Sequence, residues 1–138
     1  MRSAFSRPPA IAAVLVALTG ISAVRAQDYP FEIAKSDPAA MAAWRRVAPE
    51  DYRKQAWIAS LDGTAGPLER VTMRGKVFLY GKTCIPHDCG GNFTAFLIAV
   101  DGSEASGLLA SQTLGVGHRF FGAPDAEARG LLERKIRE

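Results

Sequence analysis

The sequence predicts an α+β fold, in which an antiparallel sheet meander of about five strands is packed against an N-terminal and a C-terminal helix. Helical patterns lie at both ends of the chain that follows residue 26, and short strand-like runs separated by turn residues lie between them. Two closely spaced cysteines fall between the two most apolar runs, which predicts a disulfide-closed loop at a hairpin tip. Such a meander buries sheet faces against helices.

Residues 1–26 are predicted to be a secretory signal peptide. Two arginines precede an apolar run over 10–24, and the tripeptide Val-Arg-Ala ending at Ala26 supplies the small residues that signal peptidase requires. The run is short and rich in small residues for a membrane span, although an uncleaved N-terminal anchor is the alternative. Cleavage after Ala26 leaves residues 27–138, in which no segment approaches a membrane span.

The net charge of the chain comes from this leader. The sequence has 17 Lys and Arg against 14 Asp and Glu, and three of the arginines but no acidic residue lie in the leader. Residues 27–138 therefore carry no net charge, which gives no reason to expect nucleic acid or a membrane surface as a partner of the mature form. Their number suits one domain with a single core.

Capping residues place the two main helices. Asp37 before Pro38 predicts the start of a helix that ends before Pro49, and a weaker pattern over 50–54 predicts a short helical stretch. A final helix is expected to begin at 124–125. The apolar face of the first helix contains Met41, Trp44 and Val47. The apolar face of the last contains Ala128, Leu131, Leu132 and Ile136.

Strand-like runs between the helices are separated by turn signals such as Asp-Gly and Arg-Gly. The predicted strands are 57–61, 68–73, 77–80, 93–100, 108–111 and 119–121. The runs 77–80 and 93–100 flank the cysteine segment, which is therefore expected at the tip of their hairpin. Gly90, Gly91 and Asn92 are expected to supply turn conformations, including a positive φ, where the loop returns to its strand.

The cysteine segment is the most informative part of the chain. It consists of Cys84, Ile85, Pro86, His87, Asp88 and Cys89. Outside the cytoplasm the two cysteines are expected to pair, and a ring of this size contributes about 2 kcal/mol in the chain-entropy account. Pro86 restricts its own backbone and that of the residue before it, so His87 is presented with little conformational entropy left to lose on binding. Asp88 is expected to accept hydrogen bonds from turn amides or the histidine ring, or to remain solvated.

Three other interpretations of the cysteines stay open. A thioredoxin-like redox centre has two residues between its cysteines at a helix start, whereas four lie here. A zinc site would use Cys84, His87 and Cys89 but needs reduced thiols and a fourth ligand. In the third interpretation, the disulfide ring only stabilises the local structure and its histidine has no function. The spacing of a catalytic triad or nucleophile elbow is absent from the sequence, so we expect no enzyme, no catalytic residue, no metal and no cofactor.

The signal peptide, the domain size and the loop motif resemble the Ivy family of periplasmic inhibitors of vertebrate C-type lysozyme. The motif of that family is Cys-Lys-Pro-His-Asp-Cys, and five of its six positions match the segment 84–89, which Gly90 follows here. The flanking region 76–111 looks like the family's central hairpin and following strand. The rest of the chain agrees in the order of its elements. Ile85 departs from the pattern, because it occupies the position of the family's lysine.

The resemblance implies that residues 27–138 form one lysozyme-inhibitor-like domain in the periplasm, where it protects peptidoglycan. Its disulfide-bounded loop would enter the active-site cleft of C-type lysozyme, and His87 would meet the two catalytic carboxyl groups. Such a cleft presents one carboxyl as acid and one as nucleophile or stabiliser, to which an imidazole can donate. Ile85 would weaken electrostatic steering and place an apolar contact on the sugar-binding walls.

Two alternatives to lysozyme inhibition remain at this point. The target could be the cell's own lytic transglycosylases, which cleave the same glycan bond with an acidic group. The protein could instead be a non-inhibitory envelope interaction protein whose ring is only a staple. The resemblance also leaves open whether the chain forms a homodimer. Outside the loop, His118 is expected at the surface, and Trp44 and Trp57 are expected in the core.

Overall fold

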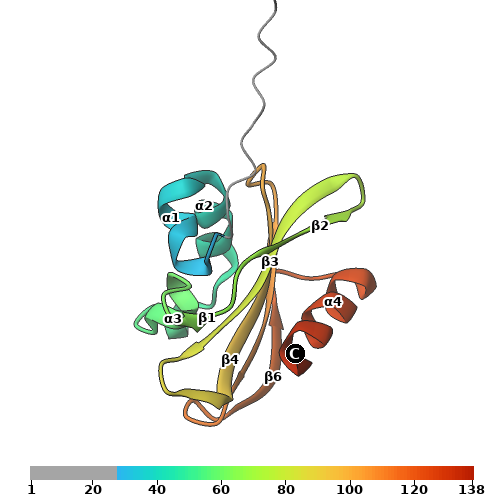
Figure 1. Cartoon of the computed structure of the whole chain (residues 1–138). Helices are drawn as coiled ribbons and strands as arrows, with labels where there is room; N and C mark the ends of the chain where they lie inside the picture. The colour runs from blue at the N-terminus through green and yellow to red at the C-terminus, as the bar shows by residue number, and fades with distance from the viewer. Residues whose placement is uncertain (1–27) are drawn as a thin grey trace, which may run out of the picture.

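An antiparallel sheet separates two groups of helices in the computed structural model, which describes residues 28–138. The predicted signal peptide 1–26 lies outside the described residues. Short helices at the N-terminal end cover one face of the sheet and the C-terminal helix covers the other (Figure 1). The α+β class, the flanking helices and the loop at a hairpin tip are therefore confirmed.

The sheet has six strands, one of them only two residues long. Its strands are β1 (Thr64–Ala65), β2 (Glu69–Met73), β3 (Lys76–Ile85), β4 (Asp88–Ala99), β5 (Ala105–Ser111) and β6 (Val116–Phe121). The order is β1-β3-β4-β5-β6, and β2 pairs with β3 beyond the end of β1. Every pairing is antiparallel, so the predicted meander is present from β2 to β6.

The two longest helices begin where capping residues were predicted. The helices are α1 (Ile33–Ser36), α2 (Pro38–Val47), α3 (Ala56–Ala59) and α4 (Ala126–Arg137), with 3₁₀ turns η1 (Pro30–Glu32) and η2 (Glu50–Tyr52). The Asp37 carboxylate accepts from the amide of Ala40 at 3.1 Å, and that of Asp125 accepts from the amide of Ala128 at 2.9 Å. These bonds satisfy amides that a helix start otherwise leaves unpaired.

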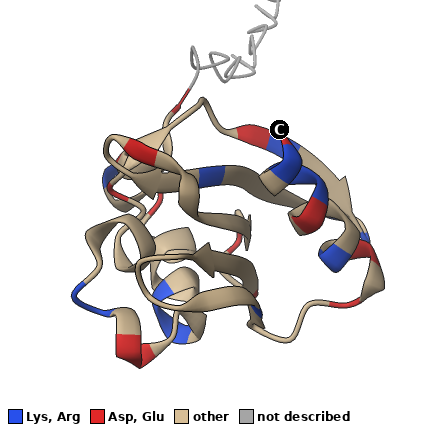
Figure 2. Cartoon of the chain, turned by 90° about the horizontal axis from the view of Figure 1, so that it is seen from below, with Lys and Arg blue, Asp and Glu red and all other residues tan. Residues whose placement is uncertain are grey.

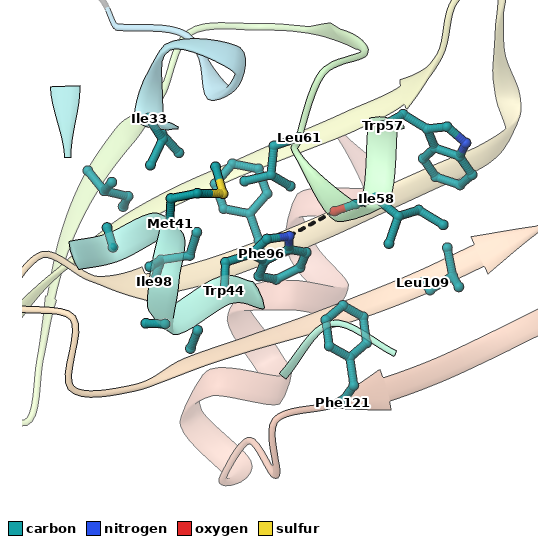
Figure 3. Close-up of a cluster of buried hydrophobic side chains, with 14 residues drawn as sticks. Ile33, Met41, Trp44, Trp57, Ile58, Leu61, Phe96, Ile98, Leu109 and Phe121 are labelled. Carbon is teal, nitrogen blue, oxygen red and sulfur yellow. Dashed lines mark hydrogen bonds between the residues drawn. The ribbon is translucent and has the colours of Figure 1, made fainter. Parts of the chain in front are cut away.

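The predicted strand over 57–61 is wrong, because this segment contains the single helical turn α3. Neighbouring side chains of a strand point to opposite faces, yet Trp57 and Ile58 are both buried. A helical turn brings both into the core and leaves the Ile58 carbonyl free to accept a 2.8 Å hydrogen bond from Nε1 of Trp44 (Figure 3). A tertiary contact has thus overridden the local strand pattern.

The main core is built around Trp44 of α2. Its ring lies edge-on to Phe96 and Phe121, with ring centroids 5.9 Å and 5.1 Å away. Phe96 pairs across the sheet with Gly81 on one side and Gly107 on the other, and Gly107 pairs with Phe121. The glycines leave room for rings, since a Cβ on residue 81 would lie 2.5 Å from the Phe96 ring.

Helix α4 is held on the opposite face by Lys135. The side chain is almost fully buried, and its ammonium contacts the carboxylates of Glu69 and Glu138 while it lies 4.7 Å from the ring centre of Tyr80. Burial alone would lower the pKa of Lys135, but hydrogen bonds to Glu138 and Glu69 outweigh burial and raise the pKa. The ammonium therefore stays charged where it ties α4 to β2.

Replacement of Gly107 by alanine tests the packing around Trp44. The added Cβ would overlap the Phe121 ring and lie 2.8 Å from Cη2 of Trp44. We expect Gly107→Ala to lower the free energy of unfolding by about 1–3 kcal/mol in chemical denaturation.

Gly117 on β6 is the matched control, because a Cβ there meets no atom within 4 Å. Gly117→Ala should leave the unfolding midpoint unchanged or slightly higher, since alanine reduces the entropy of the unfolded chain. Equal midpoints for the two variants would contradict this account of the core.

Candidate functional site: the disulfide-closed loop

The β3–β4 hairpin ends in the cysteine segment. Regular pairing runs from Phe78 opposite Ala99 to Cys84 opposite Phe93, after which the register shifts so that Ile85 lies opposite Asp88. A disulfide joins Cys84 to Cys89 across this irregular tip, with a Cα–Cα distance of 5.0 Å. The predicted pairing of the cysteines is confirmed.

His87 occupies the outermost turn of the hairpin. Pro86 and His87 are the two residues between the paired Ile85 and Asp88, and both are exposed. The φ of His87 is 67°, so the histidine itself has the left-handed conformation that the turn requires. Proline followed by a residue of positive φ is the pattern of a type II turn. The imidazole is therefore held outward at the tip by its own backbone.

The expected positive φ at Gly90 and Gly91 is wrong. Both glycines lie within β4, and the described glycines with positive φ are at positions 75, 102, 115 and 122. The physical reason is that His87 closes the turn, so the chain has already reversed direction before Gly90. A Cβ on residue 91 would instead approach the side chain of Gln112 to 2.7 Å, which indicates close packing against the β5–β6 turn.

The inner side of the loop is anchored in the protein. Cys84 is buried, and the half-buried Ile85 packs against the main core. Ile85, which departs from the family motif, thus uses part of its apolar surface within its own domain. The exposed residues Pro86, His87, Asp88 and Cys89 form the outer surface of the loop.

A second support lies on the β1 side of the hairpin. Thr64 of β1 pairs with Cys84, and a Cβ on Gly63 would collide with the Cys84 carbonyl oxygen and lie 2.8 Å from Cβ of Trp57. The hydroxyl of Thr83 donates to the carbonyl oxygen of Trp57 at 2.6 Å. The base of the loop is therefore held against α3 by the Thr83 hydroxyl and against β1 by a close backbone approach that requires glycine at position 63.

Asp88 accepts a hydrogen bond within the site, but from a different donor than the sequence indicated. Its Oδ2 accepts from Nδ2 of Asn92 at 2.7 Å, not from a turn amide or the histidine ring. Asn92 is 1% exposed, and its Oδ1 accepts from Oγ of Ser111 at 2.6 Å and from the Thr113 amide at 3.1 Å. The loop is thereby linked to the turn between β5 and β6.

Asn92 was missed as a site residue because it was grouped with Gly90 and Gly91 as a turn residue. Asparagine is depleted in strands, so its place directly before the apolar run 93–100 was a usable signal for side-chain hydrogen bonding. The other expectations outside the loop hold: His118 is exposed on β6, and Trp44 and Trp57 are buried.

The geometry bears on the alternative interpretations of the cysteines. Both sulfur atoms that zinc would need are engaged in the disulfide. The cysteines lie on neighbouring antiparallel strands and not at a helix start, where a thioredoxin-like centre would be. Within residues 28–138, no group of three or more His, Cys, Asp or Glu side chains is placed to hold a metal ion.

Lys and Arg residues are interspersed with Asp and Glu over the described part of the chain (Figure 2). Several are paired: Arg74 contacts both Glu104 and Asp125. Among residues 28–138, no helix has the length and apolar character needed to cross a membrane.

Comparison with known proteins identifies the family. The family described as Inhibitor of vertebrate lysozyme (Ivy) matches residues 39–116, which include the whole disulfide-closed loop. This chain belongs to the Ivy family, and the resemblance based on the loop motif is confirmed.

Two proteins of Pseudomonas aeruginosa are similar to this chain. One is named "Inhibitor of vertebrate lysozyme" and is 26% identical over 110 residues, which cover 72% of each chain. The other is an uncharacterized protein that is 25% identical over 116 residues, which cover 77% of this chain and 75% of the relative.

Loss of the disulfide should loosen the loop without unfolding the domain, because β1 and the core hold its base independently. We expect Cys84→Ser with Cys89→Ser to lower the free energy of unfolding by about 2 kcal/mol. Amide hydrogen exchange should accelerate most at Ile85 and within 87–91, and in β4 beyond residue 93 it should accelerate only as far as the lower global stability requires.

Reduction of the wild-type disulfide should give the same local exchange pattern and serves as the control for the serine substitutions. Global loss of the circular dichroism signal in the double variant would contradict a local role for the disulfide.

Proposed function

We propose that this protein is a periplasmic, non-enzymatic inhibitor of C-type lysozyme, which blocks the enzyme by inserting the loop 84–89 into its active-site cleft. The observation that carries the proposal is the exposed His87 at the tip of a turn closed by a disulfide and supported from both sides. Membership in the Ivy family and the printed name of a Pseudomonas aeruginosa relative support lysozyme as the target.

Occlusion requires a loop that does not rearrange on binding. Ordering a flexible loop reduces affinity, because each immobilised side chain loses conformational entropy. Here the disulfide, the fixed φ of Pro86 and the left-handed backbone of His87 restrict the tip before binding. Affinity can therefore come from contacts that His87 makes in the cleft, with little of it lost to ordering the tip.

The imidazole suits the chemistry of the proposed target site. A glycosidase of this type uses two carboxyl groups, one as acid and one as nucleophile or stabiliser. His87 would donate hydrogen bonds to these groups from a partly desolvated cleft, where charge-assisted hydrogen bonds are strong. No bond of the inhibitor breaks, so the enzyme is blocked by occupancy of its catalytic site.

Secretion is part of the proposal. Removal of residues 1–26 by signal peptidase would release a single domain, residues 27–138, into the oxidising periplasm. Formation of the Cys84–Cys89 disulfide is favoured in that compartment. The domain would then meet lysozyme that has reached the cell envelope and protect peptidoglycan from it.

Substitution of His87 by asparagine tests the role of the imidazole. Asparagine tolerates the left-handed backbone better than alanine does, so His87→Asn removes the ring while it keeps the turn. We expect the inhibition constant in a cell-wall lysis assay with C-type lysozyme to rise about 10- to 100-fold.

His118→Asn is the matched control, because His118 is exposed on β6 and is the second of the two histidines in the chain. This variant should inhibit like the wild type. Unchanged inhibition by His87→Asn, with inhibition by wild type present, would refute the proposed contact. Lack of inhibition by folded, oxidised wild type would refute lysozyme as the target and make lytic transglycosylases the next enzymes to assay.

The pH dependence of binding tests whether His87 acts as a charged group. If the protonated ring pairs with carboxylates, binding favours proton uptake and affinity falls as pH rises. Histidine side chains in general exchange their proton near pH ~6.5, so the dissociation constant should increase between pH ~5.5 and ~8.

His87→Asn provides the control for titrating groups of the enzyme, and its dissociation constant should vary less over the same range. A wild-type dissociation constant that is independent of pH would exclude charge pairing and leave neutral hydrogen bonding by the imidazole.

A further inference from the structure

Asn92 stands out among the buried polar residues because its hydrogen-bond partners lie in two separate parts of the site. It lies on β4 directly opposite Ser111 at the end of β5. Its Nδ2 donates to the Asp88 carboxylate in the loop, whereas its Oδ1 accepts from the Ser111 hydroxyl and the Thr113 amide. One side chain thus contacts the loop and the β5–β6 turn at the same time.

The orientation of the Asn92 amide is fixed by its partners. The Asp88 carboxylate only accepts hydrogen bonds and the Thr113 amide only donates one, so a flipped Asn92 would face a like group on both sides. The Asn92 side chain is 1% exposed, which leaves water no access to replace either partner. A buried polar group in this position is costly unless it is fully hydrogen-bonded.

The β5–β6 turn on the other side of Asn92 is itself well defined. Its residues are 112–115, and the Gly115 amide donates to the Gln112 carbonyl at 3.2 Å. The Ser111 hydroxyl, which donates to Asn92, also accepts from the Leu114 amide at 3.1 Å. Leu114 packs against the main core. The turn is therefore a fixed point to which the loop can be attached.

On the β4 side of the loop, regular strand pairing does not reach the tip. The register shift after Cys84 leaves residues 89–92 without strand partners on β3. On the side of β4 that faces β5, the Gln112 amide donates to the Gly91 carbonyl at 2.8 Å, and the Gln112 side chain packs closely against Gly91. The hydrogen bond between the side chains of Asn92 and Asp88 connects this part of β4 to the loop tip.

We propose that Asn92 is the positioning residue of the inhibitory loop, which it holds in fixed register with the turn 112–115 through Asp88. The proposal rests on the proposed function, since the loop acts on the target and Asn92 acts only through it. Figure 1 shows the hairpin tip and the turn between β5 and β6 at the same end of the sheet. The Asp88–Asn92 hydrogen bond links the loop to the turn 112–115, which is anchored in the core through Leu114.

The test exchanges the side chains of Asp88 and Asn92. In Asn92→Asp the donor to Asp88 is lost and two carboxylates face each other, while the acceptor for Ser111 and Thr113 is kept. We expect inhibition of C-type lysozyme to weaken about tenfold. Asp88→Asn alone retains an acceptor for Asn92 and is the single-variant reference.

Combination of Asp88→Asn with Asn92→Asp restores one donor and one acceptor in the reverse direction. The added effect of Asn92→Asp should then shrink to less than about threefold, as expected for directly coupled residues. A purely structural role in the strand would give the same loss in both backgrounds. An equal loss would therefore overturn the proposal.

Hydrogen exchange of the free protein provides a readout that does not depend on lysozyme. In Asn92→Asp the amides of 87–90 should exchange at least about tenfold faster, whereas the Thr113 amide should stay protected because the introduced carboxylate still accepts from it. Recovery of slow exchange in the exchanged pair supports the proposal, and unchanged exchange in Asn92→Asp contradicts it. If wild type fails to inhibit lysozyme, the function fails while this measurement still decides the role of Asn92.

Discussion

The packing of Trp44 against a row of alternating glycine and phenylalanine is the constraint on which the structure depends. The row runs across four strands as Gly81, Phe96, Gly107 and Phe121, so the rings fill the space that the glycines leave. Trp44 covers this row and donates to the carbonyl of Ile58, which fixes α3 over the sheet. An aromatic ring above a strand glycine gives specific packing that small side chains alone do not provide.

The same contacts extend from the core to the loop. Once α3 is placed, the carbonyl of Trp57 meets the Thr83 hydroxyl, and the Gly63 backbone approaches Cys84. Asn92 supports the other side through Asp88. The two supports reach opposite ends of the disulfide-closed segment, so the exposed tip with His87 is the part that remains free to meet a partner. Rigidity at the base and exposure at the tip suit a protein that blocks a cleft without reacting.

Local sequence patterns predicted those parts of the fold that local physics determines. The caps at Asp37 and Asp125, the apolar strands of the central hairpin and the paired cysteines follow from residue types at short spacing. The turn α3 was missed because its helical form depends on a hydrogen bond from Trp44, 14 residues away. The role of Asn92 was missed for the same reason, since its partners Ser111 and Thr113 lie on another hairpin.

Competition for the lysozyme cleft tests the central claim most directly. Calorimetric titration of C-type lysozyme with residues 27–138 should be carried out with and without a saturating, non-hydrolysable oligosaccharide analogue that covers the two catalytic carboxyl groups. Insertion of the His87 loop predicts that the competitor raises the apparent dissociation constant by a factor of one plus the ratio of its free concentration to its own dissociation constant. Binding of equal affinity to the filled and the empty enzyme would contradict inhibition by cleft occlusion.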